Sequence, residues 1–317
     1  MPRHVAVVFV HGIFAEGFSY AEPMRKGLLR LLPRELQSCV TFDSVFWAQE
    51  VRGRQRKLMQ NVRAHTDVVD NHLRRFLIEG LGDAAAYQKT RHRENSMYYD
   101  VHASIGHVLD RMNLPGRGDQ PLVFIGHSLG CHIISSFVWD LNKLKQRTAA
   151  DIQSEPDEAI RREWKALQPP DAAADHKGAS PFRRLDTLAG FVTLGSNMPL
   201  FTFTFGPDRV FPITQSPPGT GLKPAFPGAG LPQPLFDKAR WLNFYSKRDL
   251  LGFPLKPLNP AYGSEPRLHD IAVRTETLAS RTVPYWSHLK AHTNYWKNPT
   301  VVQHTATLIR EIAETGA

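Results

Sequence analysis

The chain contains very little cysteine, and this limits its covalent framework. Cys39 and Cys131 are the only cysteines among 317 residues. Two cysteines cannot form a disulfide framework, and a single bridge is not expected in a reducing compartment. We expect Cys131 to be a small apolar packing residue at the start of a buried helix rather than a redox group.

Long hydrophobic runs are also missing. The early apolar run at residues 5–10 is too short to span a bilayer, and His11-Gly12 interrupts it. It lacks the small-residue cleavage site of a signal peptide, so it indicates a strand. No other stretch approaches the length of a membrane span. We therefore expect a cytoplasmic location, with peripheral membrane contact left open.

Acidic residues are outnumbered by basic ones. The chain has 30 Asp and Glu against 39 Lys and Arg, which gives a net charge of +9. Basic clusters at 52–57 and 89–93 could bind phosphates, but such clusters are more often solvated helix faces. No RNA-binding aromatic signature or metal-finger spacing accompanies them. We expect no nucleic-acid partner, and the oligomeric state stays open.

Sequence signatures of cofactors and metals are absent as well. No Gly-x-Gly-x-x-Gly follows a strand, and no Walker A sequence occurs. The histidines and acidic residues show no metal-ligand spacing such as His-Glu-x-x-His. We therefore expect neither a cofactor nor a metal.

Strand-like and helix-like segments alternate along the chain. Apolar runs predict strands at 5–10, 40–47, 122–125, 185–194, 241–245 and 270–273. Periodic segments predict helices at 19–32, 51–79, 100–112 and 131–143, and a last helix that Asn298-Pro299 opens. This alternation predicts an α/β fold: a mostly parallel central sheet with helices on both faces, in a single domain over residues 1–317.

Two segments interrupt this alternation and are predicted to be insertions. Residues 146–181 are charged, rich in alanine and punctuated by proline, with a short helix expected at 160–167. Residues 197–236 are dense in proline and phenylalanine. Proline disfavours regular structure there. The second segment is either a long packed loop or a cap that supplies the wall of an acyl pocket.

The sequence Gly126-His127-Ser128-Leu129-Gly130 follows a predicted strand and precedes a predicted helix. In Gly-x-Ser-x-Gly the serine occupies a strained strand-to-helix turn, and glycine is needed two residues to either side to avoid collisions. A base can then activate the serine hydroxyl as a nucleophile. The Leu129 amide would bind the developing oxyanion. The alternative is that Ser128 merely caps the helix.

A second glycine turn follows the first strand, in Val10-His11-Gly12-Ile13. Glycine would let the chain turn beneath a substrate carbonyl, and the Ile13 amide is the candidate second donor to the oxyanion. The alternative is an ordinary strand-to-loop turn.

With these two features, the chain resembles the α/β-hydrolase superfamily, in particular its lipase- and esterase-like members. The resemblance rests on the His11-Gly12 loop, on residues 126–130 and on the order of the acidic residues and histidines later in the chain. It covers most of the chain outside the two insertions. It implies an α/β-hydrolase fold and the chain order serine, acid, histidine. The motifs of this broad superfamily identify the machinery well and the substrate poorly.

The implied acid should follow a strand beyond the serine. Asp249 follows the predicted strand 241–245 and is the candidate, with the role of orienting the histidine and stabilising its positive charge. The alternative is a solvated turn aspartate. Asp237, which precedes that strand, and Asp270, which opens the next one, are the competitors.

The implied histidine should lie in a loop after the last strand. Four histidines follow the acid: His269, His288, His292 and His304. His269 precedes the last predicted strand and His304 lies in the final helix. His292 is preferred over His288 because it lies closer to the helix start at Asn298, and because the run from His292 to Trp296 looks like the family's catalytic-histidine loop.

Together these residues predict a serine hydrolase that cleaves small-molecule carboxylic esters, with lipid-like acyl groups suggested by the phenylalanine-rich insertion. Ser128, Asp249 and His292 would form the catalytic triad, and Leu129 and Ile13 the oxyanion hole. The nearer alternatives are a thioesterase, an amidase or an acyltransferase that uses the same machinery. The farther one is a non-catalytic binding module on a hydrolase scaffold.

Overall fold

The fold is built on one parallel β-sheet, seen in a computed structural model that describes residues 2–13, 15, 17–65, 82–90, 93, 96–170, 178–204, 206–275 and 291–315. Its strands are β1 (Val5–Val10), β2 (Val40–Val45), β3 (Leu122–His127), β4 (Leu188–Leu194), β5 (Arg240–Tyr245) and β6 (Leu268–Ala272). The six strands lie in the order β2-β1-β3-β4-β5-β6, and every neighbouring pair is parallel. The predicted α/β class with a parallel sheet is confirmed.

Burial explains why these segments form strands. Every residue of β1, β3 and β4 is buried, because helices cover both faces of the central strands. Edge strand β6 is mostly exposed or half-buried. Since all strands run in one direction, their C-terminal ends lie together along one side of the sheet, at Val10, His127, Leu194 and Tyr245. The loops that leave these strand ends bring distant parts of the chain together.

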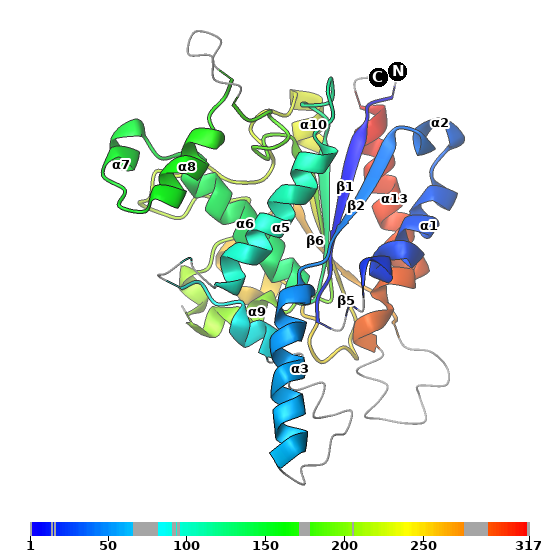
Figure 1. Cartoon of the computed structure of the whole chain (residues 1–317). Helices are drawn as coiled ribbons and strands as arrows, with labels where there is room; N and C mark the ends of the chain where they lie inside the picture. Colours follow the sequence, from blue (N-terminus) through cyan, green and yellow to red (C-terminus); the bar gives the residue numbers. More distant parts are fainter. Residues whose placement is uncertain are drawn as a thin grey trace.

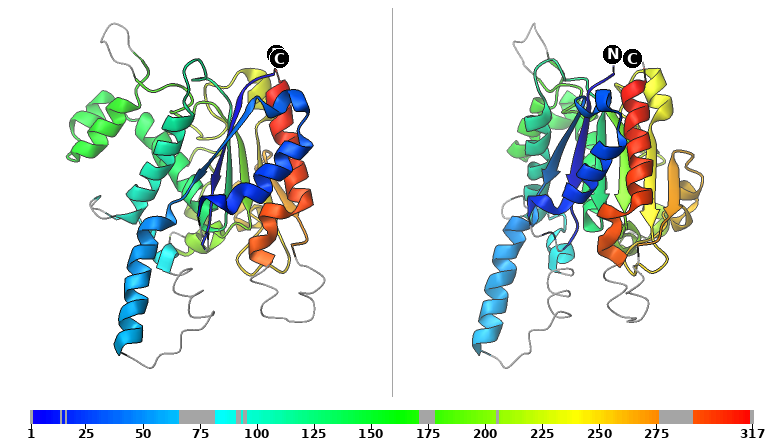
Figure 2. Two further views of the ribbon diagram at one scale, coloured as in Figure 1. Left: turned by 45° about the vertical axis from the view of Figure 1, so that its right-hand side comes forward. Right: turned by 90° about the vertical axis from the view of Figure 1, so that its right-hand side faces the viewer.

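Helices cover both faces of the sheet (Figures 1 and 2). Helices α1 (Glu22–Leu31) and α13 (Pro299–Glu314) pack together on one face, and α5 (Met97–Met112) and α6 (Leu129–Lys145) pack together on the other. Helix α3 (Ala48–His65) projects away from the sheet, at the bottom of Figure 1. In the described ranges, no helix combines the length and the apolar character needed to cross a bilayer.

Several element boundaries differ from the predicted ones. Strand β4 begins at Leu188 rather than Leu185, because Leu185 adopts a left-handed conformation with φ 59° in the preceding turn. Helix α5 starts at Met97, three residues before the predicted start. Of the helix predicted over 51–79, α3 accounts for the part up to His65, and residues 66–81 lie outside the described ones.

The two insertions contain short helices. The first holds α7 (Ala149–Gln153) and α8 (Glu158–Ala166), with residues 171–177 outside the described part. The second holds α9 (Met198–Phe201), η2 (Thr202–Thr204), η3 (Pro207–Arg209) and the start of α10 (Gln233–Lys238). Helix α9 packs against α6, so the second insertion covers the helix that follows Ser128.

The start of α13 is capped as the sequence predicts. Asn298 Oδ1 accepts hydrogen bonds from the amides of Thr300, at 3.0 Å, and Val301, at 3.3 Å. Asn298→Ala removes this acceptor and should lower the free energy of unfolding by about 1 kcal/mol in chemical denaturation. Asn298→Ser retains an acceptor and should lower it by less. Equal losses for both variants would show that the cap is not the source of the stability.

Candidate active site

Ser128 occupies a strained turn between β3 and α6. Its backbone has φ 53° and ψ −124°, a conformation that residues other than glycine rarely adopt. The Ser128 amide donates to the Leu194 carbonyl at 2.9 Å, and the Cys131 amide donates to the Ser128 carbonyl at 3.0 Å. Ser128 is at the N-cap position of α6, but its side chain makes no capping hydrogen bond. The simple helix-cap alternative is therefore wrong.

Glycines allow the close packing around this turn. A Cβ on Gly126 would lie 3.0 Å from the backbone of Cys131, and a Cβ on Gly130 would overlap the carbonyl oxygens at the end of β1. Gly12 is the third such position, because a Cβ there would overlap the side chain of Ser128. The loop after β1 therefore lies directly against the serine.

His292 connects Ser128 to Asp249. Its Nε2 atom is 2.7 Å from Ser128 Oγ, and its Nδ1 atom is 2.9 Å and 3.0 Å from the two carboxylate oxygens of Asp249. All three side chains are buried. Because Nδ1 faces a carboxylate, the Nδ1–H tautomer donates to Asp249 and leaves Nε2 free to accept the serine proton.

The carboxylate of Asp249 accepts two further hydrogen bonds. The Leu251 amide donates to Oδ1 at 2.9 Å, and the Tyr295 hydroxyl donates to Oδ2 at 2.8 Å. Burial by itself raises the pKa of Asp249, but the hydrogen bonds from His292, Leu251 and Tyr295 outweigh it, and the pKa lies below its ordinary value. Asp249 is therefore a carboxylate at neutral pH.

Tyr295 contacts the candidate acid, which the sequence did not indicate. Its hydroxyl accepts from the Ser246 amide at 2.9 Å and donates to Asp249. Burial, together with the neighbouring Asp249 charge, raises the pKa of Tyr295, so the phenol keeps the proton that it donates. The only signal in the sequence is its position three residues after His292.

His127 is a second missed residue, and it holds the backbone of His292. Its Nε2–H donates to the His292 carbonyl at 2.6 Å. Burial, and then the neighbouring His292, lowers the pKa of His127 to about 3, so the ring is neutral near pH 7. It occupies a variable position of Gly-x-Ser-x-Gly, so the motif carried no signal for it.

The two predicted oxyanion donors lie on segments next to Ser128. Leu129 is the first residue of α6, so its amide has no acceptor within the helix and lies at the positive end of the helix dipole. Ile13 follows Gly12, whose backbone packs on Ser128. His11 fixes this loop: its Nδ1–H donates to the Gly12 carbonyl at 2.6 Å, and its own carbonyl accepts from Trp47 Nε1 at 2.9 Å.

The competing acids and histidines lie elsewhere. Asp270 accepts from the amides of Leu255 and Lys256, and the exposed Asp237 accepts from Gln233 on α10. His269 on β6 and His304 on α13 are exposed. His288 lies outside the described residues. No group of three or more His, Cys, Asp or Glu side chains suited to a metal ion occurs in the described part of the chain.

No protein-family model matches the chain, and no curated protein shows significant similarity to it.

The neutrality of His127 predicts a pH dependence of stability. An unfolded histidine binds a proton below about pH 6.5, whereas folded His127 does so only near pH 3. The free energy of unfolding should therefore fall as the pH is lowered from 6.5 towards 4, by up to about 1.4 kcal/mol per pH unit for this residue. His127→Gln keeps an N–H donor but does not titrate, so denaturation from pH 4.5 to 7 should show a shallower slope.

Asn298→Ala serves as the control for this experiment, because it lowers stability without changing a titratable group. Its slope should match that of the wild type. A wild-type slope in His127→Gln would contradict the neutral, buried state of His127.

Proposed function

We propose that the chain is a serine hydrolase of the α/β-hydrolase type that cleaves carboxylic esters. The observation that carries this proposal is the position of His292, which is within hydrogen-bond distance of Ser128 on one side and of Asp249 on the other. The parallel sheet supports it, because the loops that hold these residues leave one edge of the sheet or lead into the final helix.

The geometry supports a two-step reaction. Ser128 Oγ attacks the ester carbonyl while His292 Nε2 takes the serine proton, and Asp249 stabilises the resulting imidazolium. The carbonyl oxygen becomes negative and receives hydrogen bonds from the Leu129 and Ile13 amides. His292 then returns the proton to the departing alcohol. Water attacks the acyl-enzyme in the second step, again with His292 as the base, and releases the acid.

An ester with an apolar group is proposed because the second insertion is rich in phenylalanine, and Phe203 within it is 83% exposed. Such side chains suit an apolar acyl or alcohol group. A thioester, amide or acyl-transfer reaction would use the same first step, so the choice among them depends on the shape of the pocket rather than on the triad.

Ser128→Ala tests the nucleophile. Because it removes the attacking oxygen, hydrolysis of p-nitrophenyl esters of rising chain length should fall by more than about 10³-fold in kcat/KM. The matched control is Ser264→Ala, at an exposed serine whose hydroxyl bonds only to the Ala261 carbonyl among the described residues. This control should keep wild-type rates. Equal rates for wild type and Ser128→Ala would rule out the assignment.

Tyr295→Phe tests the support of the acid. Losing one hydrogen bond to a buried carboxylate should lower kcat by about tenfold, since Asp249 then orients His292 and stabilises its positive charge less well. Tyr295 holds Asp249 and does not touch Ser128, so KM should change by less than about twofold. Steady-state kinetics separate the two constants. An unchanged kcat, or a change confined to KM, would show that Tyr295 is only a packing residue.

A further inference from the structure

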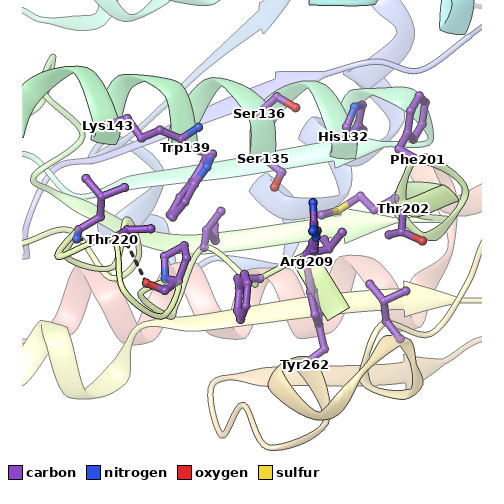
Figure 3. A pocket seen from close by; sticks show the side chains of 17 residues that line it. His132, Ser135, Ser136, Trp139, Lys143, Phe201, Thr202, Arg209, Thr220 and Tyr262 are labelled. Carbon is purple, nitrogen blue, oxygen red and sulfur yellow. Dashed lines mark hydrogen bonds between the residues drawn. The ribbon is translucent and has the colours of Figure 1, made fainter. Parts of the chain in front are cut away.

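A second site lies along the flank of α6, in an elongated cavity of about 460 Å³ (Figure 3). One wall is a face of α6 that carries His132, Ser135, Ser136, Trp139 and Lys143. The opposite wall comes from the second insertion and from the segment around Tyr262 in α11 (Pro260–Gly263). The sequence suggested the second insertion as a possible pocket wall, but it did not indicate that the opposite wall would be α6, because the two walls are far apart along the chain.

The cavity is distinct from the triad, although it begins close to it. Ser128 is not among the residues that line it. At the end nearest the start of α6, the rings of His132 and Phe201 stack in parallel with centroids 3.9 Å apart. The lining face then runs from His132 to Lys143, a distance of about 16 Å along the helix. This length suits an elongated ligand. Because Ser128 does not line the cavity, such a ligand can bind there without contacting it.

The inner surface of the cavity is apolar. Met198, Ile213 and Tyr262 line it and are almost fully buried, and Trp139 and Phe211 add half-buried aromatic surface. Binding of an apolar ligand to such walls is favourable, and the free energy of binding becomes more negative in proportion to the apolar area removed from water.

The charges on the walls are all positive. Arg209 and Lys143 line the cavity, and no Asp or Glu is found among its described lining residues. Lys143 lies over the ring of Trp139 and has the carboxylate of Asp140 at 3.9 Å, so its charge is partly balanced. Arg209 is exposed and lies on the wall opposite Ser135, and its guanidinium makes no hydrogen bond or ion pair with any described residue. Its guanidinium is available to an anion.

The cations that line a neighbouring cavity of about 680 Å³ differ from Arg209 in having acidic partners. Lys89 pairs with Asp140, Arg93 with Glu163 and Arg183 with Asp110. The two other cations of this lining, Lys143 and Arg147, have Asp140 at 3.9 Å and Glu155 at 2.7 Å, so each cation there has an acidic partner, which Arg209 lacks.

We propose that the cavity along α6 binds an amphipathic monoanion, with an apolar body against Trp139, Met198 and Ile213 and a carboxylate or similar group on Arg209. Guanidinium groups bind carboxylates through parallel hydrogen bonds. The site goes beyond the proposed hydrolase activity and does not depend on Ser128 being nucleophilic.

Three eight-carbon ligands test the proposal by isothermal titration calorimetry at low ionic strength: octanoate, octanol and octylammonium. None contains an ester, so binding is separated from hydrolysis. We expect octanoate to bind about tenfold more tightly than octanol, and octylammonium to bind least. Arg209→Gln should weaken octanoate by about tenfold and leave octanol within twofold. Arg310→Gln, at an exposed arginine on α13, is the matched control and should leave all three affinities unchanged.

Ser135→Phe supplies an independent test, because it fills the cavity from the α6 wall. It should abolish binding of octanoate and octanol, with thermal unfolding used to check that the variant folds. If it does not fold, Arg209→Gln decides. The proposal is overturned if no ligand binds the wild type, if octanoate and octylammonium bind equally, if Arg209→Gln leaves octanoate unchanged, or if folded Ser135→Phe still binds octanoate.

Discussion

The structure of the site depends on one buried imidazole that is hydrogen-bonded on both sides. His292 has Ser128 Oγ at 2.7 Å and the Asp249 carboxylate at 2.9 Å, and all three groups are removed from water. A buried polar group without a partner costs more free energy than most single contacts contribute, so each of the three requires the other two. The parallel sheet makes this possible, because the chain leaves the same sheet edge after β3 and after β5.

The surrounding residues stabilise the side chains of this site and the strained backbone of Ser128. Ser128 keeps a left-handed backbone that only tight packing can maintain, and Gly12 and Gly130 permit that packing. Tyr295 fixes Asp249, and His127 fixes the backbone of His292. A chain that only needed a helix cap at Ser128 would not require these contacts. The pattern is that of a site whose central side chains are held in place by supporting hydrogen bonds.

The sequence predicts the parts of the fold and site that are encoded locally. The run 5–10 predicts a strand with the observed bounds because all six residues are apolar, whereas the prediction of a strand from Leu185 is wrong because a left-handed turn leaves no hydrophobic signal. The chain order serine, acid, histidine led to the three residues that the structure brings together. Tyr295, His127 and Arg209 were missed, because each has its role through partners distant in sequence or through a cavity that exists only after folding.

The central claim is that Ser128 is an activated nucleophile, and covalent labelling with a fluorophosphonate tests it most directly. Such a probe forms a bond only with a serine whose proton a neighbouring base can remove. Intact-protein mass spectrometry, followed by peptide mapping, should show one adduct on Ser128 of the folded protein and none after acid or urea unfolding. Absence of an adduct on the folded protein, or an adduct on another serine, would contradict the account and favour a non-catalytic binding protein.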